Sequence, residues 1–237
     1  MVDTRDLKSL DQEWLCGFES RSRHISPPPI MMKNNTEWSE NVILADADYV
    51  DSVAFNLTVN FERMLGRRVP QADMTLWAEC VAMDGGAPLC PHEGEKIVTE
   101  SLRLILVHDR QNSSLKNFTP GRYADELDGK AVQSRVGELA FTAVQTEDMA
   151  PKEQLLRDLL QLLCEQKAVK RLMVVVDDAM VSALRPILQR HDSDERRTTL
   201  LTMQPVQGGA YRHELLGYSL MAALGISSRE IEEKLKK

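Results

Sequence analysis

The chain lacks the sequence features of several common protein classes. Its four cysteines, at positions 16, 80, 90 and 164, form no CxxC pair, which argues against a zinc site and is typical of reduced thiols in a cytosolic protein. Its longest apolar runs have the length of a strand, far below the roughly 20 residues of a membrane span. No secretory signal opens the chain. We therefore expect a cytoplasmic protein without a membrane partner.

Positive charge and glycine-rich catalytic motifs are also scarce. The 29 lysines and arginines are outnumbered by 36 acidic residues, which gives a net charge of −7. Broad adhesion to nucleic acid needs a basic face, so the composition argues against it and leaves only a local basic patch open. The sequence contains neither a GxSxG elbow nor a Walker-type loop, so neither a serine nucleophile of that kind nor a P-loop is predicted.

The organisation along the chain predicts one folded domain with two appendages. Residues 1–40 are polar, are interrupted by three consecutive prolines, and are predicted to form a flexible extension. Met31 and Met32 lie near the end of this segment and are candidate start sites. Residues 41–226 are long enough to bury one core and are expected to form a single domain. Residues 227–237 are expected to form a charged terminal helix.

Strand and helix patterns alternate through the domain. Apolar runs predict a strand beginning at residue 42 and further strands at 101–108, 137–145, 170–176 and 198–204. Three- and four-residue spacing predicts helices at 51–66, 71–82, 152–168, 179–190, 211–224 and 227–236, with a short helix near 124–135. This alternation predicts a doubly wound α/β fold, with a mostly parallel sheet of about five strands flanked by helices.

Two of the apolar runs, residues 42–45 and 172–176, lead directly into pairs of aspartates. The pairs are Asp46 with Asp48, and Asp177 with Asp178. In open α/β sheets the ligand crevice lies beyond the carboxyl ends of the strands, so we expect these side chains at one crevice. Such carboxylates are able to hold Mg²⁺, which stabilises phosphoryl charge and activates water. The alternative is that each aspartate caps the helix that follows it.

Three further residues are weaker candidates for the same site. His108 ends a predicted strand and is a candidate general base, with a solvent-exposed turn histidine as the alternative. Gly208 and Gly209 follow a predicted strand and precede a predicted helix, so their amides are candidates for binding an anion. A simple turn is the alternative for these two glycines.

Three segments resemble an uncharacterised bacterial family known only as a domain of unknown function. They are ILADADYVDSVAFNLTVNFERMLGRR, MQPVQGG and ELLGYSLMAALGI. The resemblance covers about residues 38–226. It implies a shared fold and no particular activity.

The order of the elements also resembles the NYN branch of PIN-like metal-dependent ribonucleases. The resemblance rests on the acid-tipped first strand, the strand LRLILVHD and the later strand LMVVVDD. It implies that Asp46, Asp48, Asp177 and Asp178 bind Mg²⁺ and that RNA is the ligand. Those enzymes usually have a small Ser- or Gly-containing turn before the later acid, where this chain has three valines. A degenerate, non-cleaving relative is therefore an alternative.

Residues 46–50, DADYV, resemble the DxDx(T/V) opening of haloacid-dehalogenase-like phosphatases. That resemblance implies that Asp46 is the nucleophile, that Asp48 is the acid/base, and that the substrate is a phosphorylated small molecule. Lys152 and the later aspartate pair follow in the expected order, but His108 stands where that family has Ser or Thr. A third alternative, from a different class, is a non-catalytic homodimeric scaffold or regulator.

Overall fold

The computed structural model describes residues 38–89, 101–147, 151–191, 195–209 and 211–235. Nearly all of the extension predicted for residues 1–40 lies outside these ranges. The strands are β1 (Asn41–Asp46), β2 (Ala72–Asp73), β3 (Ser101–His108), β4 (Phe118–Thr119), β5 (Ala131–Ser134), β6 (Gly137–Gln145), β7 (Arg171–Val175), β8 (Arg197–Thr202) and β9 (Arg212–Leu215). The helices are α1 (Ala47–Leu65), α2 (Met74–Asp84), α3 (Lys152–Glu165), α4 (Val181–Arg190), α5 (Leu216–Ala223) and α6 (Ser228–Leu235), with single turns η2 (Tyr123–Leu127) and η3 (Asp178–Met180).

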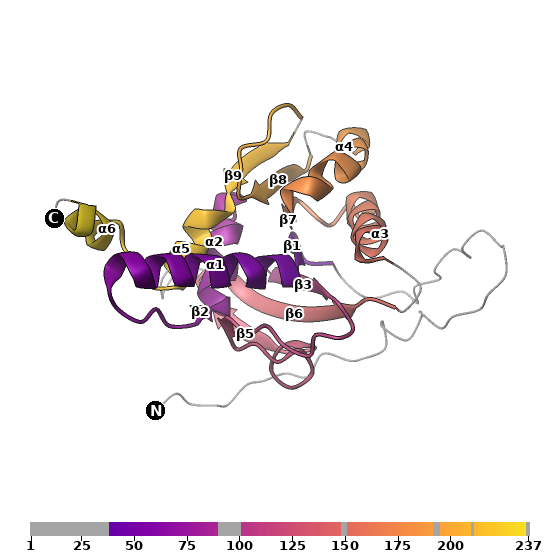
Figure 1. Cartoon of the computed structure of the whole chain (residues 1–237). Coiled ribbons are helices and arrows are strands. Elements are labelled where there is room, and N and C mark those ends of the chain that lie inside the picture. Colours follow the sequence, from indigo (N-terminus) through magenta and orange to yellow (C-terminus); the bar gives the residue numbers. More distant parts are fainter. Residues whose placement is uncertain (1–37, 90–100, 148–150, 192–194, 210, 236–237) are drawn as a thin grey trace, which may run out of the picture.

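The main sheet has seven strands in the order β5-β6-β3-β1-β7-β8-β9 (Figure 1). Every neighbouring pair is parallel except β5 with β6. The short strands β2 and β4 form a separate two-stranded sheet. These pairings confirm the predicted α/β fold with a mostly parallel sheet.

Two of the predicted helices are wrong in part. In both cases some of the residues predicted to be helical form an edge strand of the sheet. The helix expected near residues 124–135 is only one turn, η2, and the chain then forms β5, which returns against β6 as an antiparallel hairpin. The helix expected over residues 211–224 begins only at Leu216, because the preceding four residues pair with β8 as strand β9. The sheet therefore has more strands than the apolar runs predict.

The core lies on both faces of the sheet, because successive side chains of a strand point to opposite sides. In β1, Ile43 and Ala45 pack on the face covered by α1, α2 and α5, whereas Val42 and Leu44 pack on the face covered by α3 and α4. All four are fully buried. Burying a side chain of the size of Val or Leu contributes about 1.5–3 kcal/mol, so β1 is a rigid centre from which the site is built.

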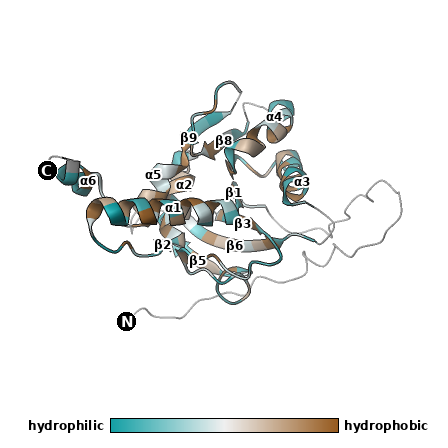
Figure 2. Ribbon diagram, in the orientation of Figure 1, coloured by the Kyte–Doolittle hydropathy of each residue, from teal (hydrophilic) through white to brown (hydrophobic). Residues whose placement is uncertain are grey.

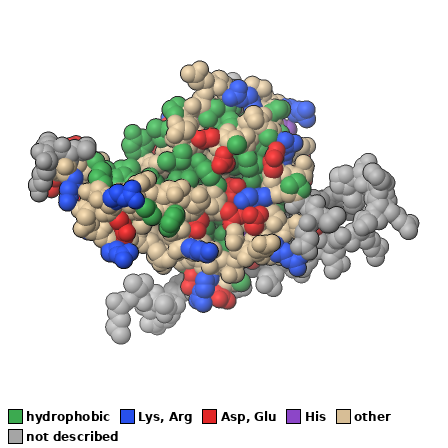
Figure 3. All heavy atoms as spheres, viewed as in Figure 1, with side chains coloured by type: hydrophobic (Ala, Val, Ile, Leu, Met, Phe, Trp, Pro, Cys, Tyr) green, Lys and Arg blue, Asp and Glu red, His purple; other side chains and the backbone are tan. Residues whose placement is uncertain are grey.

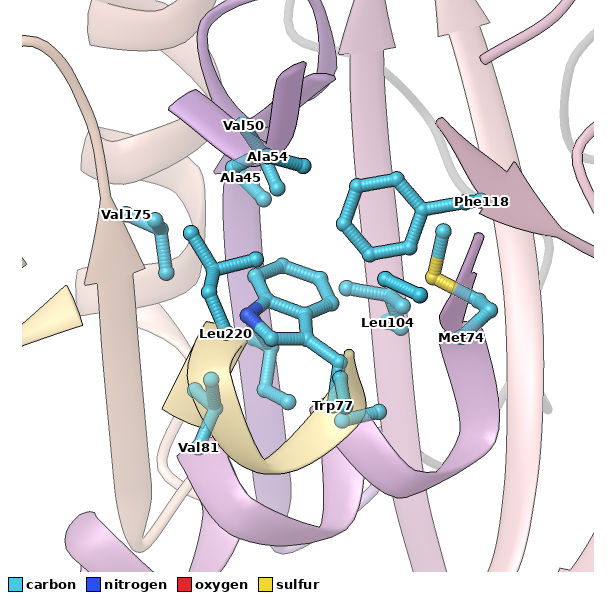
Figure 4. Packing of buried hydrophobic residues seen from close by; sticks show 14 of the residues in the cluster. Ala45, Val50, Ala54, Met74, Trp77, Val81, Leu104, Phe118, Val175 and Leu220 are labelled. Atoms are coloured by element: carbon cyan, nitrogen blue, oxygen red, sulfur yellow. The ribbon is translucent and has the colours of Figure 1, made fainter. Parts of the chain in front are cut away.

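Trp77 of α2 is the largest side chain of the core on the face covered by α1, α2 and α5. It lies against Phe118, with ring centroids 5.7 Å apart and ring planes at 66°. Figure 4 shows the indole between the strand that carries Leu104 and the helix that carries Leu220. Aromatic pairs in this edge-to-face geometry contribute about 0.5–1.5 kcal/mol beyond their burial. The packing fixes α2 and α5 against the sheet.

Helix α1 begins directly where β1 ends. The side chain of Asp46 accepts a hydrogen bond from the amide of Tyr49 and so caps the helix. The spacing predicts that the helix starts at Asp51. In the structure it starts earlier, at Ala47. It ends at Gly66, which has φ of 69° and donates to the carbonyl of Glu62. This strand-to-helix junction places both members of the first aspartate pair at the edge of the sheet.

Helix α6 is largely hydrophilic in Figure 2. Its Glu230 forms an ion pair with Arg67, which follows α1, at 2.6 Å. Helix α6 lies within residues 227–237, the segment predicted to form a charged terminal helix. None of the helices in the described ranges is both long and apolar enough to cross a membrane.

Candidate functional site

The candidate site lies at the carboxyl edge of the sheet, where β1, β3 and β7 end together. Their parallel register sets Asp46 beside Val107 of β3, and Ala45 beside Val175 of β7. His108 and Asp109 therefore continue from β3 on one side of Asp46, and the second aspartate pair continues from β7 on the other. The two aspartate pairs lie at the same edge of the sheet, as the sequence predicts.

An ammonium group joins the acids of the first pair. Nζ of Lys152, the first residue of α3, lies 2.9 Å from Asp46 Oδ1, 2.9 Å from Asp48 Oδ2 and 3.7 Å from Asp109 Oδ2. We name these four residues the acid–lysine cluster. The side chain of Asp46 is 6 % exposed, and those of Asp48 and Lys152 are 19 % and 20 % exposed. Acidic and basic side chains gather over the start of α1 in Figure 3.

Burial and pairing act in opposite directions on the titration of these groups. Burial raises the pKa of Asp46, and the hydrogen bonds from Lys152 and the Tyr49 amide offset only part of this effect. Burial also raises the pKa of Asp48, but the hydrogen bonds from Lys152, the Asp109 amide and Asn112 outweigh it, so that pKa lies below its usual range. Burial lowers the pKa of Lys152, but its two carboxylate partners outweigh this and raise it. The cluster therefore holds an ionised lysine beside an ionised Asp48.

The loop after β3 is tied to the first turns of α1 by two aspartates. Asp48 accepts from the Asp109 amide at 2.8 Å and from Asn112 Nδ2 at 2.6 Å. One turn later, Asp51 accepts from the Asn117 amide at 2.8 Å and from its Nδ2 at 3.1 Å. These bonds fix the carboxylate of Asp48 in place, because each of its oxygens has a partner.

The second aspartate pair has separate neighbours. Asp177 accepts from the amide of Ala179 at 2.7 Å and so caps the turn η3. Asp178 has one buried oxygen, Oδ1, without a hydrogen-bond partner in the described part of the chain. Burial, and then the charges of Asp178, Asp177 and Asp46, raise the pKa of Tyr49 to about 12, so members of both pairs act on this hydroxyl. The helix-cap alternative is therefore observed for Asp46 and for Asp177.

The four aspartates do not gather around one point. Within the described ranges, no group of three or more His, Cys, Asp or Glu side chains is arranged to hold a metal ion. The observed cation at Asp46 and Asp48 is the ammonium of Lys152. Mg²⁺ at these residues, and at Asp177 and Asp178, stays a prediction.

His108 is buried rather than exposed in a turn. It is 6 % exposed and stacks on Tyr123, with ring centroids 3.8 Å apart and ring planes at 8°. Its Nδ1 lies 3.1 Å from the carbonyl of Asp109. The solvent-exposed alternative is therefore wrong, and the role of general base stays a prediction.

The reason for expecting an anion at Gly208 and Gly209 is removed by the structure. Both glycines have positive φ, 77° and 144°, but the next element is strand β9 and not a helix. The helix expected directly after this turn is therefore not the next described element, and anion binding by the two glycines stays a prediction. The carbonyl of Gly208 accepts from the hydroxyl of Tyr211 at 3.1 Å, which agrees with the simple-turn alternative.

Comparison with protein families gives a match over most of the chain. A family model matches residues 35–231. The chain belongs to a family of unknown function, DUF6621. No curated protein and no solved structure matched the chain.

Membership of DUF6621 agrees with the resemblance to a domain of unknown function, and the matched residues contain the whole acid–lysine cluster. The family description carries no activity. The chemistry of this DUF6621 chain therefore has to be argued from its own side chains.

Sequence reasoning identified Asp46 and Asp48 but not the way they are held, and it did not single out Asp109. Lys152 entered only through the resemblance to phosphatases, although its place after Pro151 at a predicted helix start puts it near a sheet edge. Asn112 and Asn117 gave no signal, because both lie in a loop without periodicity. Their role depends on contacts with α1 that only the folded chain makes.

Proposed function

We propose that this DUF6621 chain binds RNA and cleaves its phosphodiester bonds at the acid–lysine cluster, as a NYN/PIN-like metal-dependent nuclease. The observation that supports the proposal is the pair of carboxylates, Asp46 and Asp48, each 2.9 Å from the same ammonium at the carboxyl edge of the sheet. Ligands of α/β proteins bind at this edge. The three carboxylates of the acid–lysine cluster outnumber its one ammonium, which favours binding of a further cation there, and Lys152 attracts a phosphate.

The donor set fits Mg²⁺. Mg²⁺ takes oxygen ligands and in phosphate-processing sites uses only one or two carboxylates, with water and substrate phosphate completing its shell. Asp46 and Asp48 would hold it. When bound, Mg²⁺ neutralises charge on a phosphodiester and makes water a better nucleophile.

The protein residues have distinct roles in this proposal. Lys152 attracts a phosphate oxygen to a chain whose net charge of −7 otherwise repels RNA. Asn112 and the Asp109 amide orient Asp48 through bonds of 2.6 and 2.8 Å. Such fixed positioning lowers the reorganisation needed when substrate binds.

The test is cleavage of a labelled single-stranded RNA by the wild type and by Asp46→Asn, with Mg²⁺, with Mn²⁺ and with EDTA. Asparagine caps helices as well as aspartate does, so this variant removes a charge and keeps the start of α1. Glu138→Gln is the matched control, since Glu138 is exposed on β6 near the opposite edge of the sheet. We expect cation-dependent cleavage by the wild type and the control, with a loss of at least 100-fold in Asp46→Asn. Equal cleavage by all three proteins contradicts the proposal.

Phosphomonoester hydrolysis through Asp46 is the second candidate, because Lys152 contacts Asp46 Oδ1 directly at 2.9 Å. A lysine beside a nucleophilic aspartate neutralises an incoming phosphate. However, the whole Asp46 residue, backbone included, is only 4 % exposed. Its oxygen Oδ1 also caps α1. Beryllofluoride separates the two candidates, because it forms a stable adduct with a nucleophilic aspartate. An adduct at Asp46, found by mass spectrometry or fluorine NMR, favours the phosphatase.

A further inference from the structure

A cavity of about 610 Å³ lies next to the acid–lysine cluster. It is formed by the carboxyl ends of β3 and β6 together with η2 and α3. Two of these elements also carry the cluster: His108 in the wall precedes Asp109, and Leu155 in the wall lies one turn after Lys152 on α3. A ligand in this cavity is therefore within reach of the cluster. Its volume lies inside the roughly 300–1,000 Å³ of small-molecule sites.

The cavity wall combines apolar side chains with hydrogen-bond acceptors. Ala143, Val144 and Leu155 are half-buried and form the apolar part. The charged residues of the wall are all acidic. They are Asp128, Glu147 and Asp158. Since neither Lys nor Arg is among the described residues of the wall, its acidic side chains repel a phosphate, and a neutral group that donates hydrogen bonds is favoured.

The wall of the cavity also contains a buried aromatic pair with hydrogen-bonding groups. His108 and Tyr123 both line it and are only 6 % and 4 % exposed. A carbonyl oxygen can only accept, so the contact of His108 Nδ1 with the carbonyl of Asp109 requires the proton on Nδ1. In the neutral ring with this proton, Nε2 is an acceptor, and it has no partner among the described residues. Burial, and next the charge of Asp48, raise the pKa of Tyr123, so its hydroxyl remains a donor.

We propose that this cavity binds a nucleobase that carries an exocyclic amino group, while the attached phosphate lies at Lys152. The proposal rests on the proposed function and adds a base preference to it. A base is flat, stacks on aromatic side chains and packs against apolar ones. The wall provides both, in the His108–Tyr123 pair and in Val144 and Leu155. Adenine, cytosine and guanine offer amino donors to His108 Nε2 and to the carboxylates of the wall. Uracil has no amino group.

The test is calorimetric binding of AMP, CMP, GMP, UMP and ribose 5-phosphate in the presence of Mg²⁺. Ala124→Trp fills the cavity from an exposed position in its wall, and Ala222→Trp is the control, because Ala222 is exposed on α5 and is not part of the wall. We expect the wild type and the control to bind the three amino-bearing nucleotides at least tenfold more tightly than UMP and ribose 5-phosphate. Ala124→Trp should remove this difference and keep the weak binding of ribose 5-phosphate.

Two outcomes overturn the proposal, and each has a different consequence for the proposed function. Equal affinity for all five ligands, unchanged by Ala124→Trp, shows phosphate binding at the cluster without a base site. Absence of binding by every nucleotide also overturns it, and RNA cleavage by the wild type and by Asp46→Asn then decides the proposed function separately. Tetranucleotides of adenylate and uridylate distinguish a strand from a free nucleotide. Tighter binding of oligoadenylate than of AMP identifies an RNA strand as the source of the base.

Discussion

Replacing Lys152 by Met should destabilise the folded chain strongly, because the ammonium is the common partner of two carboxylates. Methionine keeps most of the aliphatic length and removes the charge. Asp46 is then left 6 % exposed without its counter-ion. Removing one partner of a buried ion pair costs about 3–5 kcal/mol. Since Asp48 and Lys152 are 19 % and 20 % exposed, we expect the lower end, about 3 kcal/mol, which corresponds to a melting temperature lower by roughly 6–12 °C.

The loss should depend on pH, and its direction follows from the charges. Without Lys152, the pKa values of Asp46 and Asp48 rise in the folded state. The folded variant then binds protons more tightly than the unfolded chain, so its free energy of unfolding increases as the pH falls toward the usual range of aspartate. The gap between wild type and Lys152→Met should therefore be largest near pH 7.5 and smaller at pH 5.

Urea unfolding at both pH values, followed by circular dichroism, measures this gap. Lys170→Met is the control, since Lys170 is exposed just before β7, at the opposite edge of the sheet, and we expect a change within about 0.5 kcal/mol. Adding Asp46→Asn to Lys152→Met should recover part of the loss, because it removes the uncompensated charge. A loss below about 1 kcal/mol, or one that is equal at both pH values, would refute the reasoning.

Two further predictions concern single side chains. Burial and then the charge of Glu214 raise the pKa of Asp84 to about 6. The folded state therefore loses stability as the pH rises from about 4 to 6, so Asp84→Asn should stabilise by about 1 kcal/mol at pH 7.5, after allowance for solvent screening, and by almost nothing at pH 4. Equal urea midpoints for variant and wild type at pH 7.5 would contradict this. Asn117→Ala removes the side-chain bonds to Asp51 and should cost about 1–2 kcal/mol; hydrogen exchange of the 109–117 loop should increase, and unchanged exchange would be the opposing result.

The general architecture follows from the sequence because the strongest signals are local. The run from Val42 to Ala45 has no polar alternation, which predicts a strand buried on both faces, and all of it is buried. One aspartate pair lies at the end of β1 and the other follows β7. Because these strands are parallel neighbours, both pairs lie at the same edge of the sheet.

The edge strands and the hydrogen bonds of the site were not predictable in the same way. Strand β9 contains Arg212 and Glu214 and is no more than half-buried, so it has no apolar run to reveal it. Strand β5 follows a single helical turn and is defined by its pairing with β6. The contact between Lys152 and Asp48 joins residues 104 positions apart. Local periodicity carries no information about such a contact, because it depends on how α3 docks beside the end of β1.

The melting temperature of the wild type and of Asp46→Asn as a function of Mg²⁺ concentration tests the central claim most directly. A ligand that binds only the folded state stabilises it by about 2.7 kcal/mol at 100 times its dissociation constant, which raises the melting temperature by roughly 5–11 °C. We predict this rise for the wild type and for Glu138→Gln, and its loss in Asp46→Asn. A wild-type melting temperature that stays constant over the whole range of Mg²⁺ would contradict a cation site formed by Asp46 and Asp48.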